Sequence, residues 1–283
     1  MSSTERVYIQ RSDEFEARRD GTYSETSGMT SVGSVVSYTS DRQSDSDFQI
    51  KYELAELQNL FGGEIPDDVL DLVEIAVATF GVDRYLERSI IAGDEVDDMD
   101  ARLNTRSIII RVPVFSDSLA TSTAQELLST MVSHMTYDVV QFDLVQHPKS
   151  TTQTCGSFDT PTPTTDAVSL FSDGLDSAGG INHNQANNIE SEYVSLNYGN
   201  GLGSRHKELQ QLLDVTPYVF QLDYEEETNE YTTFSRGFLH WVFAAATAVS
   251  HQIPEIRAFE TGLMARFAIL NEGWHTTRTV SPV

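Results

Sequence analysis

The chain has 283 residues, with 43 acidic and 18 basic side chains, a formal net charge of −25 and one cysteine. A single cysteine excludes an intrachain disulfide and a cysteine-based zinc cluster, and it indicates a reducing, cytoplasmic compartment. No apolar run approaches the roughly 18 residues that a membrane-spanning helix needs, and residues 1–20 lack the apolar core of a signal peptide. We therefore expect a soluble, cytoplasmic protein with no membrane partner.

The acidic residues are spread along the whole chain, and Lys51, Lys149 and Lys207 are its only lysines. A strongly acidic surface with few lysines is typical of proteins that work in concentrated salt, so we infer a halophilic source. The same negative field repels polyanions, and we expect no non-specific binding to nucleic acid. Unfolding in dilute buffer with recovery in molar salt would support the halophilic hypothesis, and indifference to salt would contradict it.

Residues 1–150 are predicted to form a smaller α+β domain of unknown role. Brief apolar alternation at 6–9 and 32–38 indicates short edge strands joined by long loops. Apolar residues at helical spacing between Tyr52 and Phe61 then indicate a helix. This part of the chain is therefore predicted to begin with strands and continue with helices.

A better-marked helix is predicted after Pro66. Proline suits the first turn of a helix, and Asp67 and Asp68 place carboxylates at the positive end of the helix dipole. Apolar residues continue to Phe80, and Gly81 predicts the end of the helix. The domain is then predicted to have a strand at 107–114, a helix at 123–135 and a strand at 137–145.

Two segments are predicted to be loops. Residues 93–100 are acidic but lack the alternating oxygen ligands and central glycine of an EF-hand, so we interpret them as a solvated loop. Residues 151–165, rich in Ser, Thr and Pro, are predicted to be an interdomain linker. Cys155 lies in this linker, and no histidine or asparagine context marks it as a nucleophile. We interpret it as an incidental surface thiol.

From residue 166 onward, predicted strands alternate with predicted helices. The strands are expected at 166–171, 193–198 and 218–224, and the helices at 175–185, 204–213 and 234–253. This alternation predicts an α/β fold with a parallel sheet and helices on both faces. The ligand site of such a sheet lies at the carboxyl ends of its strands.

A short loop of Ser and Gly follows the first of these strands. Residues 170–177 read Leu-Phe-Ser-Asp-Gly-Leu-Asp-Ser and lead into a helix. Backbone N–H groups and hydroxyls at the start of a helix can bind a phosphate. An ordinary capped turn has the same composition, so the interpretation depends on the segments that follow.

Four segments in chain order resemble the 7-cyano-7-deazaguanine synthase branch of the ATP-pyrophosphatase superfamily. The loop from Ser172 is similar to its Ser-Gly-Gly-x-Asp-Ser phosphate loop, with Asp173 where the family has glycine. The other segments are similar to its Tyr-Gly turn and Arg-His-x-x-Glu-Leu helix (193–209), its arginine before a long apolar helix (234–239) and its Glu-Asn-Gly turn (259–263). The resemblance covers residues 166–264.

The resemblance implies an adenine nucleotide alpha hydrolase-like fold for residues 166–283, with ATP and Mg²⁺ as cofactors. It implies that a small-molecule carboxylate attacks the α-phosphate of ATP, and that ammonia then displaces AMP to give an amide or a nitrile. The implied ATP-binding residues are Ser172, Asp173, Gly174, Leu175, Asp176, Ser177 and Tyr198. Asp176, Lys207 and Arg236 are implied as catalytic residues, Arg205 and Glu260 as substrate-binding residues, and no protein metal site is assigned.

Two alternatives stay open at this stage. The synthase branch carries zinc-binding cysteines near its C-terminus and this chain does not, and we expect residues 166–283 to be C-terminally short. Either the chain is a truncated or divergent member of the branch, or a protein partner supplies the missing part. Relatives with an added N-terminal domain resemble components of antiviral defence or nucleic-acid modification systems, which is the first alternative. The second is a catalytically inactive nucleotide-binding or assembly subunit, favoured by Asp173 and by the missing cysteines.

Overall fold

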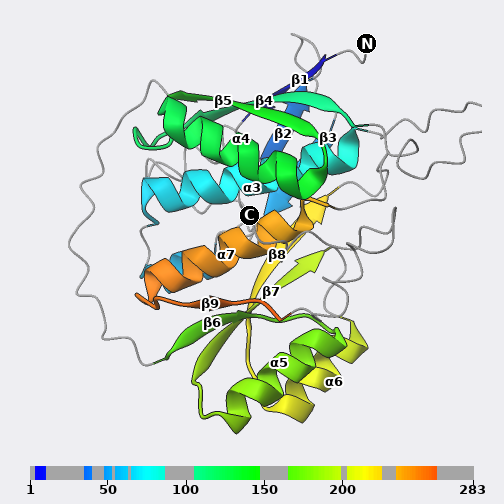
Figure 1. Ribbon diagram of the computed structural model, residues 1–283, viewed down its shortest axis with the longest axis vertical. Coiled ribbons are helices and arrows are strands. Elements are labelled where there is room, and N and C mark those ends of the chain that lie inside the picture. Colours follow the sequence, from blue (N-terminus) through cyan, green and yellow to red (C-terminus); the bar gives the residue numbers. More distant parts are fainter. Residues whose placement is uncertain are drawn as a thin grey trace, which may run out of the picture.

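The computed structural model describes residues 4–10, 35–39, 48–52, 55–62, 65–86, 105–146, 165–198, 203–224 and 234–259. Within these ranges, nine strands form one continuous sheet in the order β5-β4-β1-β2-β3-β8-β7-β6-β9 (Figure 1). The strands are β1 (Thr4–Gln10), β2 (Val35–Thr39), β3 (Phe48–Tyr52), β4 (Ser107–Val114), β5 (Val139–Gln146), β6 (Ala167–Leu170), β7 (Ser191–Tyr198), β8 (Tyr218–Tyr224) and β9 (Ile256–Arg257). None of the helices in these ranges combines the length and apolarity needed to cross a bilayer.

The sheet consists of two parallel blocks that run in opposite directions. Strands β1, β4 and β5 are parallel to one another, as are β8, β7, β6 and β9. Three antiparallel pairings, β1 with β2, β2 with β3 and β3 with β8, connect the blocks. The amino ends of the first block therefore lie on the same edge of the sheet as the carboxyl ends of the second.

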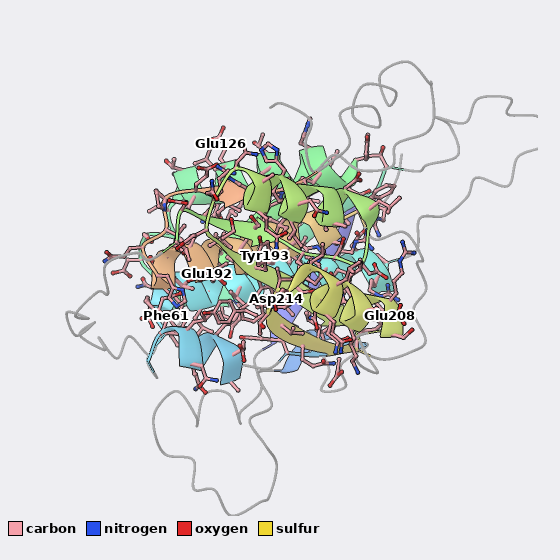
Figure 2. All side chains as sticks on the ribbon, turned by 90° about the horizontal axis from the view of Figure 1, so that it is seen from below. Phe61, Glu126, Glu192, Tyr193, Glu208 and Asp214 are labelled. Carbon is pink, nitrogen blue, oxygen red and sulfur yellow. The ribbon has the colours of Figure 1, made fainter. Side chains whose placement is uncertain are left out.

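Helices cover both faces of the second block (Figure 1). Helix α7 (Arg236–Ser250) packs on one face of this block with α2 (Ala55–Leu60) beside it, and α5 (Leu175–Ala186) and α6 (Ser204–Leu213) pack on the other face. Helices α3 (Asp67–Tyr85) and α4 (Ser122–Thr136) continue the layer of α7 over the rest of the sheet, where α3 contacts β3 and α4 contacts β5. Side chains alternate accordingly along β7, where Val194 and Leu196 join the larger core and Tyr193 joins the smaller one. In Figure 2, which looks onto α5 and α6, Tyr193 lies between these two helices. The predicted α/β class with parallel strands is confirmed.

Both halves of the sequence contribute to the larger core and to the sheet. Strand β3, which was not predicted, pairs with β8 through Ile50 and Tyr224. Helix α3 packs against α7. Residues 147–164, which contain most of the predicted linker and Cys155, lie outside the described residues, as does the acidic stretch 93–100.

Several predictions for the first half of the chain are wrong, because contacts between distant segments decide the structure there. Strands β1 and β2 were expected at an edge but lie in the middle of the sheet, because β1 pairs with both β4 and β2. Tyr52 was expected in a helix but ends β3, where its hydroxyl donates to Glu74 at 3.2 Å. Helix α3 passes through the buried Gly81, where its end was expected, and continues to Tyr85. The added turn carries Asp83 into a buried charge network, and the ion pair of Asp83 stabilises this end of the helix.

That network is centred on Arg106, the residue before β4. Its guanidinium lies 2.5 Å from Asp83 of α3 and 2.5 Å from Asp138, which precedes β5. All three side chains are buried. Burial opposes the charge of Arg106, but its hydrogen bonds and the negative charges of Asp138 and Asp83 outweigh this and raise the pKa of Arg106. The second oxygen of Asp83 accepts bonds from Ser235 N–H at 2.9 Å and Oγ at 2.8 Å.

Helix α4 covers the outer edge of β5 with a polar stripe. Ser133 Oγ accepts from the N–H of Val140 at 2.8 Å, Ser129 Oγ from Phe142 at 2.9 Å and Gln125 Oε1 from Leu144 at 3.3 Å. The spacing of these side chains along α4 matches the spacing of the N–H groups along β5, because four residues of helix rise about 6 Å and two residues of strand about 6.6 Å. Edge strands with unpaired N–H groups can pair with other chains, and this stripe occupies those groups.

Replacing Arg106 tests the charge network. We expect Arg106→Met to lower the free energy of unfolding by about 3–5 kcal/mol, because two buried carboxylates lose their counter-charge. The control is Arg111→Met on β4, since Arg111 is half exposed and forms a 3.6 Å ion pair with Asp143; its effect should stay within about 0.5 kcal/mol. Denaturant unfolding in molar KCl measures both, and equal effects would show that the network does not stabilise the fold.

Removing the polar stripe tests its covering role. We expect Ser129→Ala with Ser133→Ala to cost about 1 kcal/mol per lost hydrogen bond, because buried strand N–H groups lose their acceptors. The exposed edge should also promote self-association, measured by light scattering after size-exclusion chromatography. Thr130→Ala, on the exposed side of the same helix, is the matched control. A double variant that is as stable and as monodisperse as this control would contradict the prediction.

Candidate functional site

The segment between β6 and α5 forms a compact loop closed by serine side chains. Ser172 N–H donates to Ser177 Oγ at 3.0 Å, and the two hydroxyl oxygens lie 2.9 Å apart. The Gly174 N–H donates to Ser172 Oγ at 3.3 Å. Ser177 is buried and Ser172 is exposed. Ser177 therefore holds the beginning of the loop against the first turn of α5.

Gly174 is the N-cap of α5 and has an extended backbone, with φ −82° and ψ 157°. A β-carbon at this position would lie 3.3 Å from Ser172 Oγ, so a larger residue would press on the loop. No side chain in the described part of the chain caps this helix end. Since the first N–H groups of a helix have no partner within it, this end can bind an anion beside the Ser172 hydroxyl.

The remaining loop residues differ in exposure. Asp173 is exposed, and Leu175 is exposed by 81%. Asp176 is half-buried in the first turn of α5. The structure therefore brings residues 172–177 together as one loop, with the Asp173 carboxylate in solvent at its rim.

His206 on α6 supports this loop from the side of the sheet. Its ring packs edge-on against Phe171, with the centroids 4.6 Å apart, and its Nε2 lies 3.3 Å from Ser195 Oγ. Burial lowers the pKa of His206, and the nearby negative charge of Asp173 opposes this shift. A buried, neutral ring in this position acts as packing between α6 and the residue that precedes the loop.

The basic candidates lie at the beginnings of helices. Arg205 and Lys207 are exposed in the first turn of α6, and Arg236 is the exposed first residue of α7. Helix α6 follows β7 and α7 follows β8 along the chain, so all three lie on the carboxyl side of the second parallel block. This is the edge on which the loop lies.

Tyr198 lies on the other face of the sheet from α5. Its ring packs against the rings of Phe80 of α3 and His240 of α7, with ring centres 5.5 Å and 6.2 Å away. Burial raises the pKa of Tyr198. The predicted ATP-binding set is therefore divided, with residues 172–177 beside α5 and Tyr198 beside α3 and α7. Glu260, the predicted substrate-binding residue, lies outside the described residues.

Sequence reasoning missed two contacts that shape this edge. Asp83 binds Ser235, which directly precedes Arg236, and so holds the beginning of α7. Gly180 of α5 faces Phe259, whose ring atoms would lie 1.9 Å from a β-carbon at position 180. The adjacent glycines 179 and 180 in a predicted helix were a usable signal for close packing. No local pattern could have paired residues 83 and 235.

Comparisons with protein-family models, with curated proteins and with solved structures returned no match.

The two adjacent glycines of α5 provide a matched test of the contact with Phe259. We expect Gly180→Ala to lower the free energy of unfolding by about 1–3 kcal/mol, because the new methyl group overlaps the ring. Gly179 is exposed and a β-carbon there meets nothing within 4 Å, so Gly179→Ala should raise stability by about 0.5–1 kcal/mol. Thermal unfolding of both variants measures the difference. Equal shifts of the same sign would contradict a close contact between Gly180 and Phe259.

Proposed function

We propose that this chain is an ATP-dependent, ligase-like enzyme that adenylates a carboxylate, similar to 7-cyano-7-deazaguanine synthase, and that the loop 172–177 binds the pyrophosphate part of ATP. The observation that carries the proposal is the geometry of this loop. A buried strand leads into hydroxyls of Ser172 and Ser177 that lie 2.9 Å apart, directly before a helix whose N-cap is glycine. Such a combination of hydroxyls and helix N–H groups suits phosphate oxygens.

The topology of the second block supports the same proposal. In the sheet these strands lie in the order β8-β7-β6-β9. Strands β7 and β8 are added on one side of β6 and β9 on the other, so the direction of winding reverses between β6 and β9. Ligands of doubly wound sheets bind in the crevice at such a reversal, on the carboxyl side. The loop follows β6, and Phe259, which approaches α5, follows β9. The loop therefore lies at the reversal.

The proposed reaction assigns a task to each group. A carboxylate oxygen of the substrate attacks the α-phosphorus of ATP and the bond to pyrophosphate breaks, giving an acyl-adenylate. Ammonia then attacks the acyl carbon and AMP leaves. Ser172, Gly174 and Ser177 hold the pyrophosphate, while Arg205, Lys207 or Arg236 neutralises the developing charge. ATP supplies the activation, since adenylation turns a poor leaving oxygen into a good one.

Magnesium fits this arrangement as a partner of the phosphates. The described residues contain no group of three or more His, Cys, Asp or Glu side chains that could hold a metal ion alone. Mg²⁺ is commonly bound through one or two carboxylates together with substrate phosphates and water. We assign this role to Asp176, whose half-buried side chain lies in the first turn of α5.

A second candidate function is a nucleotide-binding subunit without turnover. Asp173 favours it, because an exposed carboxylate at the rim of the loop repels the phosphates that the loop would hold. In this case ATP binds but no acyl-adenylate forms.

The decisive experiment is calorimetric titration of Mg-ATP in molar KCl, followed by pyrophosphate release with 7-carboxy-7-deazaguanine and ammonium. We expect binding with release for the proposed enzyme. Binding without release supports the inactive subunit or a different carboxylate, and no binding contradicts both functions.

Variants of the loop locate the site. Ser177→Ala should weaken ATP binding roughly tenfold, since it removes the hydroxyl that organises the loop. Asp173→Gly should strengthen binding or raise turnover, because it removes the repelling carboxylate. Ser250→Ala, at the far end of α7, is the control that should leave binding unchanged. Binding that is insensitive to both loop variants would place ATP elsewhere.

A further inference from the structure

The last segment that the structure describes, residues 254–259, lies at the surface on one edge of the sheet. It contains β9, which pairs in parallel with β6 (Figure 1). None of its residues is buried, whereas Ile253, directly before it, is buried. Each of the strands β4 to β8, by contrast, contains buried residues. A segment with so little buried surface opens easily unless specific contacts hold it.

One of these contacts joins the segment to a buried amide on α5. Asn184 is fully buried, and its side-chain nitrogen donates to Ser169 Oγ of β6 at 3.1 Å and to Ser191 Oγ of β7 at 2.9 Å. Its side-chain oxygen accepts from a guanidinium N–H of Arg257 at 3.0 Å. Because a buried polar atom that loses its partner is costly, Asn184 favours the arrangement in which Arg257 is docked.

The other contacts of Arg257 lie within its own segment. Its Nε donates to Glu255 Oε1 at 2.7 Å, and the Glu255 side chain is 51% exposed against 23% for Arg257. Exposed ion pairs contribute little to stability. The bond to Asn184, which lies in the protein interior, is therefore the polar contact that fixes the Arg257 side chain.

Phe259 provides a second contact with the same helix. The Phe259 ring lies against Gly180, where a β-carbon would clash with it. Gly180 is four residues before Asn184 on α5, and Phe259 is two residues after Arg257. These spacings match, because four residues of helix rise about 6 Å and two residues of extended chain about 6.6 Å. The segment is thus docked on α5 at two points, and the place of Phe259 depends on that of Arg257.

The docked segment borders the loop 172–177. In the pairing of β6 with β9, Ser169 lies opposite Arg257. The same register continued by two residues brings Phe259 level with Phe171, the residue directly before the loop. The segment therefore flanks the loop on the side where the winding of the sheet reverses.

We propose that Arg257 is a positioning residue, which docks residues 254–259 on α5 through Asn184 so that this segment forms one side of the ATP site. The docking stands on the contacts alone, whereas the role at the ATP site rests on the function proposed above. Arg257 does not itself lie at the loop and acts through the place of Phe259. Release of the segment would leave the loop open on the side of β9 and weaken its hold on ATP.

The test combines hydrogen exchange of the backbone N–H groups of residues 255–259 with calorimetric titration of Mg-ATP, both on the full chain in molar KCl. Arg257→Met keeps the aliphatic stem and removes the donor to Asn184. We expect this exchange to rise roughly tenfold and Mg-ATP to bind roughly tenfold more weakly. Arg257→Lys keeps a cationic donor and should restore part of both properties.

Two further variants make the test specific. Glu255→Gln leaves the bond between Arg257 and Asn184 in place, so this matched control should resemble the wild type in exchange and in ATP affinity. Gly180→Ala displaces Phe259 without touching Arg257. It should therefore raise the exchange of the same N–H groups and weaken ATP binding as well.

The outcomes separate the docking, its role at the site and the proposed function. Wild-type exchange in both Arg257→Met and Gly180→Ala overturns the docking. Faster exchange with wild-type ATP affinity shows a contact that serves the fold alone, and overturns the positioning role. A wild-type chain that does not bind ATP rejects the proposed function together with the role at the ATP site, while the exchange data still decide whether Arg257 docks the segment.

Discussion

The structure depends on one buried guanidinium. Arg106 loses its hydration in the core, and this cost is offset only if Asp83 and Asp138 arrive with their oxygens in place. The three residues come from α3, from the position just before β4 and from the turn before β5. A helix and two parallel strands are therefore tied together at one point, and a misplaced element would leave a charge buried without a partner. The network selects one arrangement of the first half of the chain.

The same network extends into the candidate site. Asp83 uses one oxygen for Arg106 and the other for the N–H and hydroxyl of Ser235. Ser235 directly precedes Arg236, so the position of this functional candidate is set by a carboxylate from the opposite half of the sequence. Stability and site geometry are coupled through Asp83, since loosening α3 would also loosen the beginning of α7.

Features that depend on neighbouring residues were predicted correctly, and features that depend on distant parts of the chain were not. Strand β8 was predicted at 218–224 with the observed bounds, because alternation and a following loop are read within a few residues. The loop 172–177 was likewise predicted as one unit. Pairing between distant segments leaves no local pattern, so the central place of β1 and β2 and the strand state of Tyr52 were missed. For the same reason, the sequence placed Tyr198 with the loop, whereas the face of β7 on which it lies was decided by packing against α3 and α7.

The opposed directions of the two parallel blocks explain why the first half of the chain reaches the site at all. In a sheet of uniformly parallel strands, the amino ends of β4 and β5 would lie on the edge away from the loop. The three antiparallel pairings through β2 and β3 reverse the first block, and so bring these amino ends beside the carboxyl ends of β7 and β8. Helix α3 runs back toward this edge and ends there with Asp83 and Arg84. The edge that carries the loop is thus bordered by the buried charges of Asp83, Arg106 and Asp138, which the reversed block places there.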